Sequence, residues 1–324
     1  MNTLADAEGR VAVACGVTPV GYLVEIPGFG GRTRVLESGS GPAVLLLHDL
    51  GTAASVWLPL MARLDGHRVL AVDLPGFGQA DPTDYRTVSY LRGFAVGFVH
   101  GVVSALGLDA VALAGNGVGG LWALWTAADR AECVRAIALL GAPAGTAGTP
   151  VLTRRKLTGW PLIGRRNGVS RDMWTRLGHT ADRLPDGWAE LAEAVAAQPE
   201  YETAFRTLSR ATSGSGGFGA TDLGRLAQPI CLLLGERDPL ARLETLGTIA
   251  DVISGPAIYA GAAGHLPWLD NEQGAADVLG AFLAETDSAP ALGRADRAAK
   301  AWPVPAPRSA STAPVADPGA SAPR

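Results

Sequence analysis

A glycine-rich turn contains the first residues whose types and spacing could do chemistry. Residues 115–120 read Gly-Asn-Gly-Val-Gly-Gly, after an apolar run at 111–114 and before a long apolar segment. A strand, a Gly-x-nucleophile-x-Gly turn and a helix form a nucleophile elbow, which presents only its central residue to the pocket. That central residue is Gly117, so neither Asn116 nor Val118 can take the nucleophile's place.

The same turn also fits a second motif. Gly115, Gly117 and Gly120 have the G-x-G-x-x-G spacing of a dinucleotide-binding loop. That loop belongs after the first strand of its domain, with an acidic residue about 20 positions further on. Here the turn follows roughly the fifth apolar run, and no acidic residue closes a following strand. The sequence therefore favours the elbow.

An acidic residue and then a histidine follow the elbow along the chain. Asp238 lies in Gly-Glu-Arg-Asp-Pro at 235–239, and His265 lies in Gly-Ala-Ala-Gly-His-Leu-Pro at 261–267. Upstream, residues 48–51 read His-Asp-Leu-Gly after the third expected strand. Nucleophile position, acid and histidine is the chain order of the α/β-hydrolase triad. On these motifs, residues 20–285 resemble the α/β-hydrolase superfamily, in its cap-bearing branch.

The resemblance implies a role for two side chains. His265 is similar to the catalytic base, and Asp238 to the acid that orients it and stabilises its protonated form. Glu236 is the alternative acid. The non-catalytic interpretations are a histidine hydrogen-bonded within a loop and a turn carboxylate before Pro239.

The resemblance also implies an oxyanion hole, formed by the backbone N–H groups of Leu50 and Val118. Asp49 stands where the family usually has glycine. Backbone donors survive such a side-chain change, but the carboxylate disfavours an anion nearby. His48 is interpreted as structural.

The missing nucleophile shapes the functional hypothesis. Removing a serine side chain leaves room for a water molecule, about 30 Å³. We therefore expect the nucleophile position at Gly117 to be vacant and able to hold a water molecule, with Asp238 and His265 as the general-base pair. The oxyanion donors would stabilise an enolate or a tetrahedral oxyanion. The first hypothesis is non-covalent hydrolysis or lyase chemistry on an ester, thioester or C–C bond of a carbonyl-containing small molecule.

Two alternatives stay open. One is a catalytically inactive ligand-binding or scaffolding protein that keeps its pocket, which the absent nucleophile and Asp49 both favour. The other is that Gly117 replaces a native serine. No metal or organic cofactor is implied by the motifs.

Alternating apolar runs and helix-length segments predict the fold. They indicate an α/β-hydrolase fold with a mostly parallel eight-stranded sheet and helices on both faces. The alternation stops between about 148 and 225, which predicts a helical cap (148–225) inserted into a core (1–147 and 226–286). An Ala-, Pro- and Ser-rich stretch predicts a disordered tail at 287–324. The clearest strands are expected at 22–27, 32–38, 43–47, 69–72, 111–114, 134–140 and 230–234, and helices at 53–64, 118–130, 172–177 and 188–197.

Composition narrows the partners and the compartment. The net charge of −4 gives no reason to expect nucleic acid, and no apolar stretch approaches the roughly 20 residues of a membrane span. Three scattered cysteines predict buried thiols, and the N-terminus lacks the pattern of a signal peptide. These features favour a cytoplasmic location and a small-molecule substrate or ligand.

The cap adds a possible partner. Residues 151–186 carry eight basic and three acidic side chains. This surplus is typical of a solvated helix face, or it could dock an anionic substrate or carrier, such as a phosphopantetheine-bearing partner. Trp160, Trp174 and Trp188 could line an apolar cavity beneath the cap or simply pack in the core.

Overall fold

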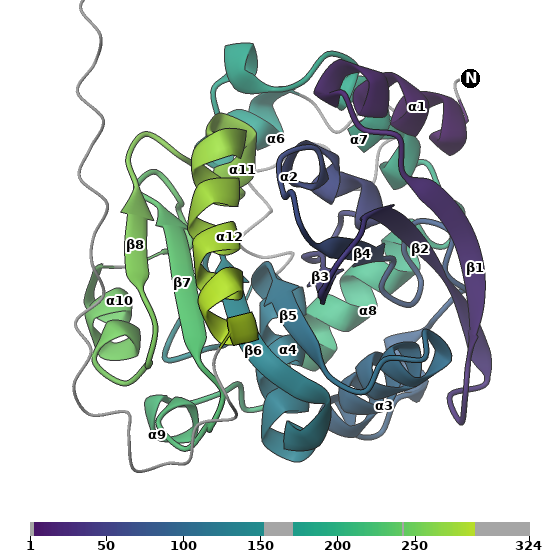
Figure 1. The fold of residues 1–324 in the computed structure, drawn as a ribbon. Coiled ribbons are helices and arrows are strands. Elements are labelled where there is room, and N and C mark those ends of the chain that lie inside the picture. Colours follow the sequence, from purple (N-terminus) through teal and green to yellow (C-terminus); the bar gives the residue numbers. More distant parts are fainter. Residues whose placement is uncertain (1–2, 152–170, 242, 289–324) are drawn as a thin grey trace, which may run out of the picture.

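A mixed sheet forms the centre of the computed structural model, which describes residues 3–151, 171–241 and 243–288 (Figure 1). Within these residues the sheet has eight strands in the order β1-β2-β4-β3-β5-β6-β7-β8. β2 pairs antiparallel with β1 and β4, and the pairs from β4 through β8 are parallel. The predicted fold class is confirmed. The strands are β1 (Val20–Ile26), β2 (Gly31–Gly39), β3 (Ala43–Leu47), β4 (Arg68–Val72), β5 (Val111–Gly115), β6 (Val134–Leu140), β7 (Ile230–Gly235) and β8 (Ala257–Ala260).

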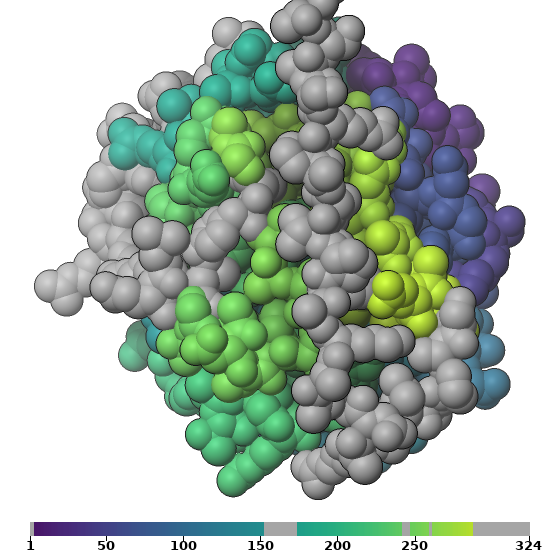
Figure 2. Space-filling view, turned by 60° about the vertical axis from the view of Figure 1, so that its left-hand side comes forward, coloured from purple at the N-terminus to yellow at the C-terminus, as the bar shows by residue number. Residues whose placement is uncertain are grey.

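Helices cover both faces of the sheet because its central strands are apolar on both sides. β3 and β5 are almost entirely buried. α12 packs beside α2 on one face, and α3 packs beside α4 on the other (Figure 1). Figure 2 shows α12, in yellow, next to the blue early part of the chain. The core helices are α2 (Leu58–Met61), α3 (Leu91–Ala105), α4 (Gly117–Asp129), α9 (Ala220–Leu223), α10 (Leu243–Ala250), α11 (Pro267–Asp270) and α12 (Glu272–Ser288).

Two helical segments differ from the expectation. The helix expected at 53–64 is instead a 3-10 turn, η1 (Ala54–Trp57), followed by the short α2, which has Pro59 in its first turn. Proline fits the first turn of an α-helix but lacks the N–H that a helix interior needs. The sequence analysis also missed α1 (Leu4–Cys15), which Thr3 and Asp6 cap at its N-terminus.

The segment between β6 and β7 contains several helices in its described part. They are α6 (Arg171–Arg176), η4 (Ala181–Arg183), α7 (Trp188–Ala196), α8 (Tyr201–Gly214) and α9, and α7 packs against α1. Residues 152–170, which hold Trp160 and five of the eight basic residues of the 151–186 segment, lie outside the described residues. So do residues 289–324 of the predicted tail, whereas Asp287 and Ser288 belong to α12.

Three structural findings bear on the compositional expectations. Cys15, Cys133 and Cys231 are free and buried, as predicted. In the described ranges, no helix has the length and hydropathy needed to cross a bilayer, and no cluster of three or more metal-ligand side chains occurs. The cytoplasmic location stays a prediction.

A buried ion-pair network ties α1 to the sheet. The Arg34 guanidinium bonds both carboxylate oxygens of Glu8 (2.6 and 2.8 Å) and, through Nε, Asp73 Oδ2 (2.8 Å). Asp73 also accepts the N–H groups of Ala54 and Gln79. Arg34 is 4% exposed, so removing its charge would leave two buried carboxylates without their counter-ion.

We expect Arg34→Met to lower the free energy of unfolding by about 3–5 kcal/mol, because it leaves the buried carboxylates of Glu8 and Asp73 without a counter-ion. The matched control is Arg32→Met, because Arg32 pairs with Asp81 at the surface. Exposed pairs contribute about 1 kcal/mol or less. Urea unfolding of the two variants checks the contrast, and equal small losses would contradict a structural role for the network.

Candidate active site

The turn between β5 and α4 has the geometry of a nucleophile elbow. Gly117 has φ +50°, the left-handed conformation that side chains other than glycine rarely adopt. A Cβ on Gly115 would strike the backbone of Gly119 and Gly120, and one on Gly119 would strike the backbone of Leu47. The flanking glycines are therefore required by close backbone approach.

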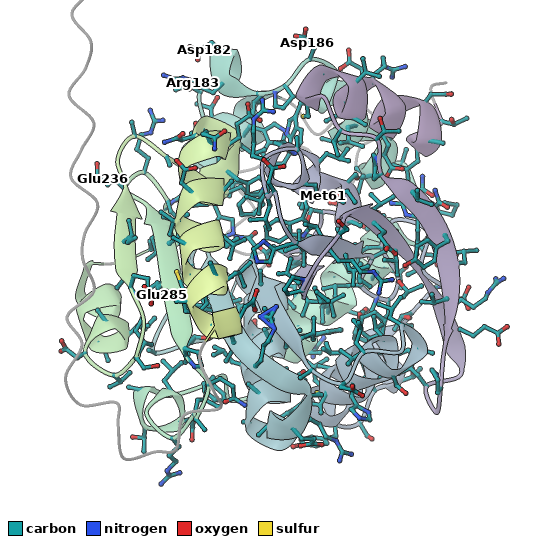
Figure 3. The ribbon with its side chains drawn as sticks, viewed as in Figure 1. Met61, Asp182, Arg183, Asp186, Glu236 and Glu285 are labelled. Atoms are coloured by element: carbon teal, nitrogen blue, oxygen red, sulfur yellow. The ribbon has the colours of Figure 1, made fainter. Side chains whose placement is uncertain are left out.

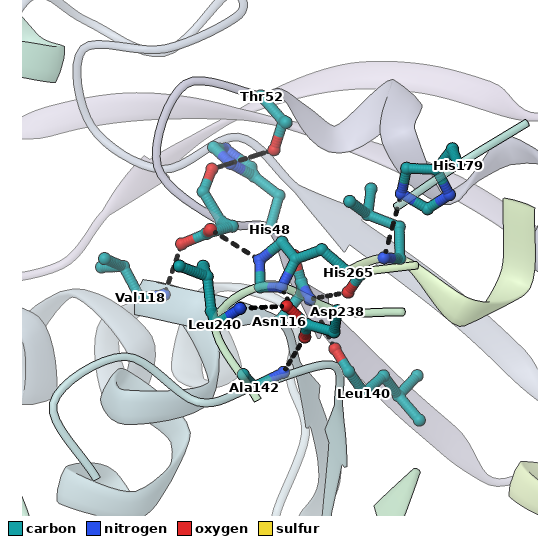
Figure 4. A network of polar contacts seen from close by, with 12 residues as sticks. His48, Thr52, Asn116, Val118, Leu140, Ala142, His179, Asp238, Leu240 and His265 are labelled. Atoms are coloured by element: carbon teal, nitrogen blue, oxygen red, sulfur yellow. Dashed lines mark hydrogen bonds and ion pairs between the residues drawn. The ribbon is translucent and has the colours of Figure 1, made fainter. Parts of the chain in front are cut away.

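The structure brings Asp238 and His265 together from the ends of β7 and β8. Asp238 Oδ2 lies 2.9 Å from His265 Nδ1, and both residues are buried (Figure 4). Asp238 also accepts the N–H of Ala142 (3.1 Å) and of Leu240 (2.8 Å), which fix its orientation. Glu236 is exposed and points outward near β7 (Figure 3), so Asp238 is the acid that contacts the histidine.

The space beside Gly117 is occupied by another side chain. Asp49 Oδ2 lies 3.1 Å from His265 Nε2, and Asp49 Oδ1 accepts the N–H of Val118 at 2.6 Å. A Cβ built on Gly117 would overlap the Asp49 carboxyl group. The expectation of a vacant position that could hold a water molecule is therefore wrong. The carboxylate from the loop after β3 lies where an elbow nucleophile would extend.

The loop after β3 is held by its neighbours. His48 Nε2 accepts the N–H of Leu74 (2.8 Å), so its Nδ1 carries the proton and donates to the Asp49 carbonyl oxygen (2.7 Å). The same carbonyl oxygen accepts the Thr52 hydroxyl. Burial lowers the pKa of His48 and keeps it neutral. His48 thus orients the loop, in agreement with its structural interpretation.

Two carboxylates flank His265 and set its charge. Burial alone would lower the pKa of His265, but the charge and hydrogen bond of Asp238, and the contact with Asp49, raise it to about 10. Burial would likewise raise the pKa of Asp238, but His265 and two backbone N–H groups lower it. At neutral pH the site is an imidazolium between two carboxylates. In this state the imidazolium of His265 can donate a proton but cannot accept one.

The two expected oxyanion donors differ in their bonding. Val118 N–H is taken by Asp49 Oδ1. For Leu50 N–H, no acceptor is found in the part of the chain that the structure describes. A substrate carbonyl that uses both donors must therefore displace one oxygen of Asp49. Their role as oxyanion donors stays a prediction.

A second buried histidine, missed by the sequence analysis, holds the His265 loop. The N–H of His265 donates to Leu177 O (2.8 Å) and that of the next residue to His179 Nε2 (3.3 Å). The N–H of the preceding residue donates to Asp270 Oδ2, which also lies 2.7 Å from His179 Nδ1. Two of these three acceptors, Leu177 and His179, lie between α6 and η4, so this segment helps to position the loop that carries His265. A lone histidine in a helical segment gives no sequence signal for this contact.

A small apolar pocket, of about 20 Å³, lies between the loop that follows Leu50 and helix α7. Trp174 and Trp188 line it and are also almost fully buried, while Trp122, Trp125 and Trp268 are buried in the core. The other lining residues are Gly51, Thr52, Ala53, Ser55, Val56, Leu191, Ala192 and Val195.

Comparisons with known proteins agree with the fold. A family model described as the alpha/beta hydrolase family matches residues 44–281. The 2-hydroxymuconate semialdehyde hydrolase of Pseudomonas sp. (strain CF600) is 29% identical over 280 residues, covering 82% of this chain and 95% of that protein. The pimeloyl-[acyl-carrier protein] methyl ester esterase of Xanthomonas campestris pv. campestris is 30% identical over 269 residues, covering 76% and 96%.

Solved structures show the same fold. The meta-cleavage product hydrolase of Pseudomonas fluorescens, as a serine-to-alanine mutant complexed with acetates, superposes with a TM-score of 0.69 at 22% identity. The match covers 82% of this chain and 98% of that chain.

Proposed function

The chain belongs to the alpha/beta hydrolase family, and from this we propose that it cleaves an ester, thioester or C–C bond next to a carbonyl group of a small molecule. Cleavage proceeds without a covalent bond to residue 117. The ion pair between Asp238 and His265, 2.9 Å apart beside the elbow, is the observation that carries the proposal. Buried ionisable groups with shifted pKa values cluster at functional sites, and this pair lies beside the elbow.

The absence of a side chain at Gly117 supports the non-covalent route. Loss of a serine nucleophile costs on the order of a millionfold in the turnover of a serine protease, so ordinary serine-esterase chemistry is excluded. The fit of Asp49 into this space favours Gly117 as the native residue, because a serine there would overlap the Asp49 carboxyl group. Leu50 and Val118 would stabilise the oxyanion once the substrate carbonyl reaches them.

The relatives favour particular bonds. One is named a hydrolase of 2-hydroxymuconate semialdehyde, which supports a C–C bond beside a carbonyl group as the bond cleaved. Another is named an esterase of an acyl-carrier protein ester. For an acyl substrate, we propose delivery on an anionic carrier to the basic residues of 151–186.

Initial rates on 2-hydroxymuconate semialdehyde and on short p-nitrophenyl esters and acyl thioesters test the proposal. We expect turnover of at least one class, with products identified by mass spectrometry. His265→Ala should lower kcat by about 10²–10⁴-fold, the usual contribution of a positioned acid or base. Retention of the full rate in His265→Ala, with normal folding, would refute the proposed role of the pair.

A second function has its own supporting observation. The Asp49 carboxylate accepts the Val118 N–H and contacts His265 Nε2. A substrate must therefore displace an internal carboxylate to reach either group. This favours a ligand-binding member of the family over an enzyme. Tight binding of a carbonyl compound that is recovered unchanged, with no product after long incubation, would select this function over the first.

A further inference from the structure

We propose that Asp49 takes the place of the missing serine as a catalytic residue: its carboxylate accepts the proton of the attacking water, and His265 donates a proton to the leaving group. The inference rests on the proposed function and names the residues that carry its proton transfers. It reverses the role that the sequence suggested for His265, from base to acid.

Position is the first argument. The Asp49 carboxyl group lies where a side chain on Gly117 would extend, although it comes from the loop after β3. It contacts the nitrogen of His265 that faces away from Asp238, which is the nitrogen that a serine hydroxyl would otherwise contact. A water molecule beside this carboxylate would be next to the elbow.

Availability of the oxygens is the second argument. Asp238 is occupied by His265 and two backbone N–H groups and lies on the far side of the imidazole. Asp49 Oδ1 is bonded to one backbone N–H, that of Val118. Exchange of this bond for a substrate carbonyl would free Oδ1 as an acceptor, while Oδ2 stays paired with His265. The loss of this charge-assisted bond is offset as negative charge develops on the carbonyl oxygen that replaces it.

Charge is the third argument. His265 lies between two carboxylates, and its pKa is raised to about 10. At neutral pH it therefore holds the proton that a leaving group needs, and Asp49 is the carboxylate in contact that can accept one. Asp49 and Asp238 are the charged groups that contact His265 among the described residues.

The proton transfers form a closed cycle. Water attacks the carbonyl carbon, a C–O bond forms, and one water proton passes to Asp49 Oδ1. The tetrahedral oxyanion, held by Val118 and Leu50, collapses and breaks the bond to the leaving group, which takes the proton of His265 Nε2. The carboxyl group of Asp49 then turns so that its protonated oxygen faces His265 Nε2, where Oδ2 lies at 3.1 Å in the resting structure, and returns the proton to His265. One water is consumed, a carboxylic acid and a protonated leaving group are released, and both side chains are restored.

The test compares kcat and KM of the full-length wild type, Asp49→Asn and, as matched control, Asp251→Asn, whose carboxylate is exposed. The probe is whichever of the ester, thioester or semialdehyde substrates the wild type turns over. We expect Asp49→Asn to lose about 10²–10⁴-fold in kcat with little change in KM, and the control to match the wild type. The wild-type rate should persist through neutral pH and fall near pH 10, where His265 loses its proton.

Two results would overturn the inference. If Asp49→Asn keeps the wild-type kcat while His265→Ala is inactive, the proposed function stands and the assignment of Asp49 fails. If a single turnover in ¹⁸O-water labels the Asp49 peptide, the carboxylate is a nucleophile that forms an anhydride and not a base. A wild type that turns over no substrate class defeats the proposed function together with this inference, which distinguishes that failure from the other two.

Discussion

Strong ester hydrolysis should appear only when Gly117→Ser and Asp49→Gly are combined. A serine Cβ at position 117 would overlap the Asp49 carboxyl group, so the single change sets the new hydroxyl against an anion. Asp49→Gly alone clears the space but supplies no nucleophile. In the double variant the hydroxyl can reach His265, and Val118 N–H is free for the oxyanion. We expect a rate on p-nitrophenyl butyrate at least about a thousandfold above either single variant.

The gain should depend on the rest of the triad. Adding His265→Ala to the double variant should abolish it, because a serine without its base is a weak nucleophile. Thermal melting of all variants controls for folding. Equal activity of Gly117→Ser and the double variant would mean that Asp49 does not block the nucleophile position.

The second large effect is a loss of stability with rising pH. The folded-state pKa of His265 is about 10, against 6.5 for an ordinary histidine. Below pH 6.5 both folded and unfolded chains hold this proton, and the stabilisation is fully present. Between 6.5 and 10 only the folded chain holds it. The free energy of unfolding should therefore fall by about 1.4 kcal/mol per pH unit in this window.

Urea unfolding of wild type and His265→Gln at pH 7 and pH 8 measures this contribution. Burial also raises the pKa of Cys15 to about 11 and of Cys231 to about 12, so both thiols lower stability at higher pH. Both thiols are present in the variant, and the difference between the two proteins isolates His265. That difference should shrink by about 1.4 kcal/mol over the interval. Parallel pH dependences would show that His265 is not charged in the folded state.

Local patterns predicted the sheet and the elbow because their causes are local. The runs of β3 and β5 are apolar at every position, as strands covered on both faces must be. The glycines around residue 117 are needed for backbone approach within one turn. The contact between Asp238 and His265 could be predicted because both residues follow neighbouring parallel strands, β7 and β8. The carboxyl ends of these strands lie at the same edge of the sheet.

The position of Asp49 could not be predicted in the same way. Asp49 and His265 lie 216 residues apart, and their contact depends on how far one side chain reaches across the sheet edge. The sequence indicated only that a carboxylate replaced the usual glycine. The missing side chain at 117 and the added one at 49 are complementary, but the complementarity appears only when both are placed in space. The contacts of His179 were missed for the same reason.

Imidazole ¹⁵N chemical shifts test most directly whether Asp49 occupies the nucleophile's place opposite His265. The chain has five histidines, so the signal of His265 can be assigned with His265→Gln. We predict that both ring nitrogens of His265 carry protons at pH 8 in the wild type. In Asp49→Gly, loss of one carboxylate should lower the pKa of His265. A His265 that titrates near pH 6.5 in the wild type, unchanged by Asp49→Gly, would contradict the assignment.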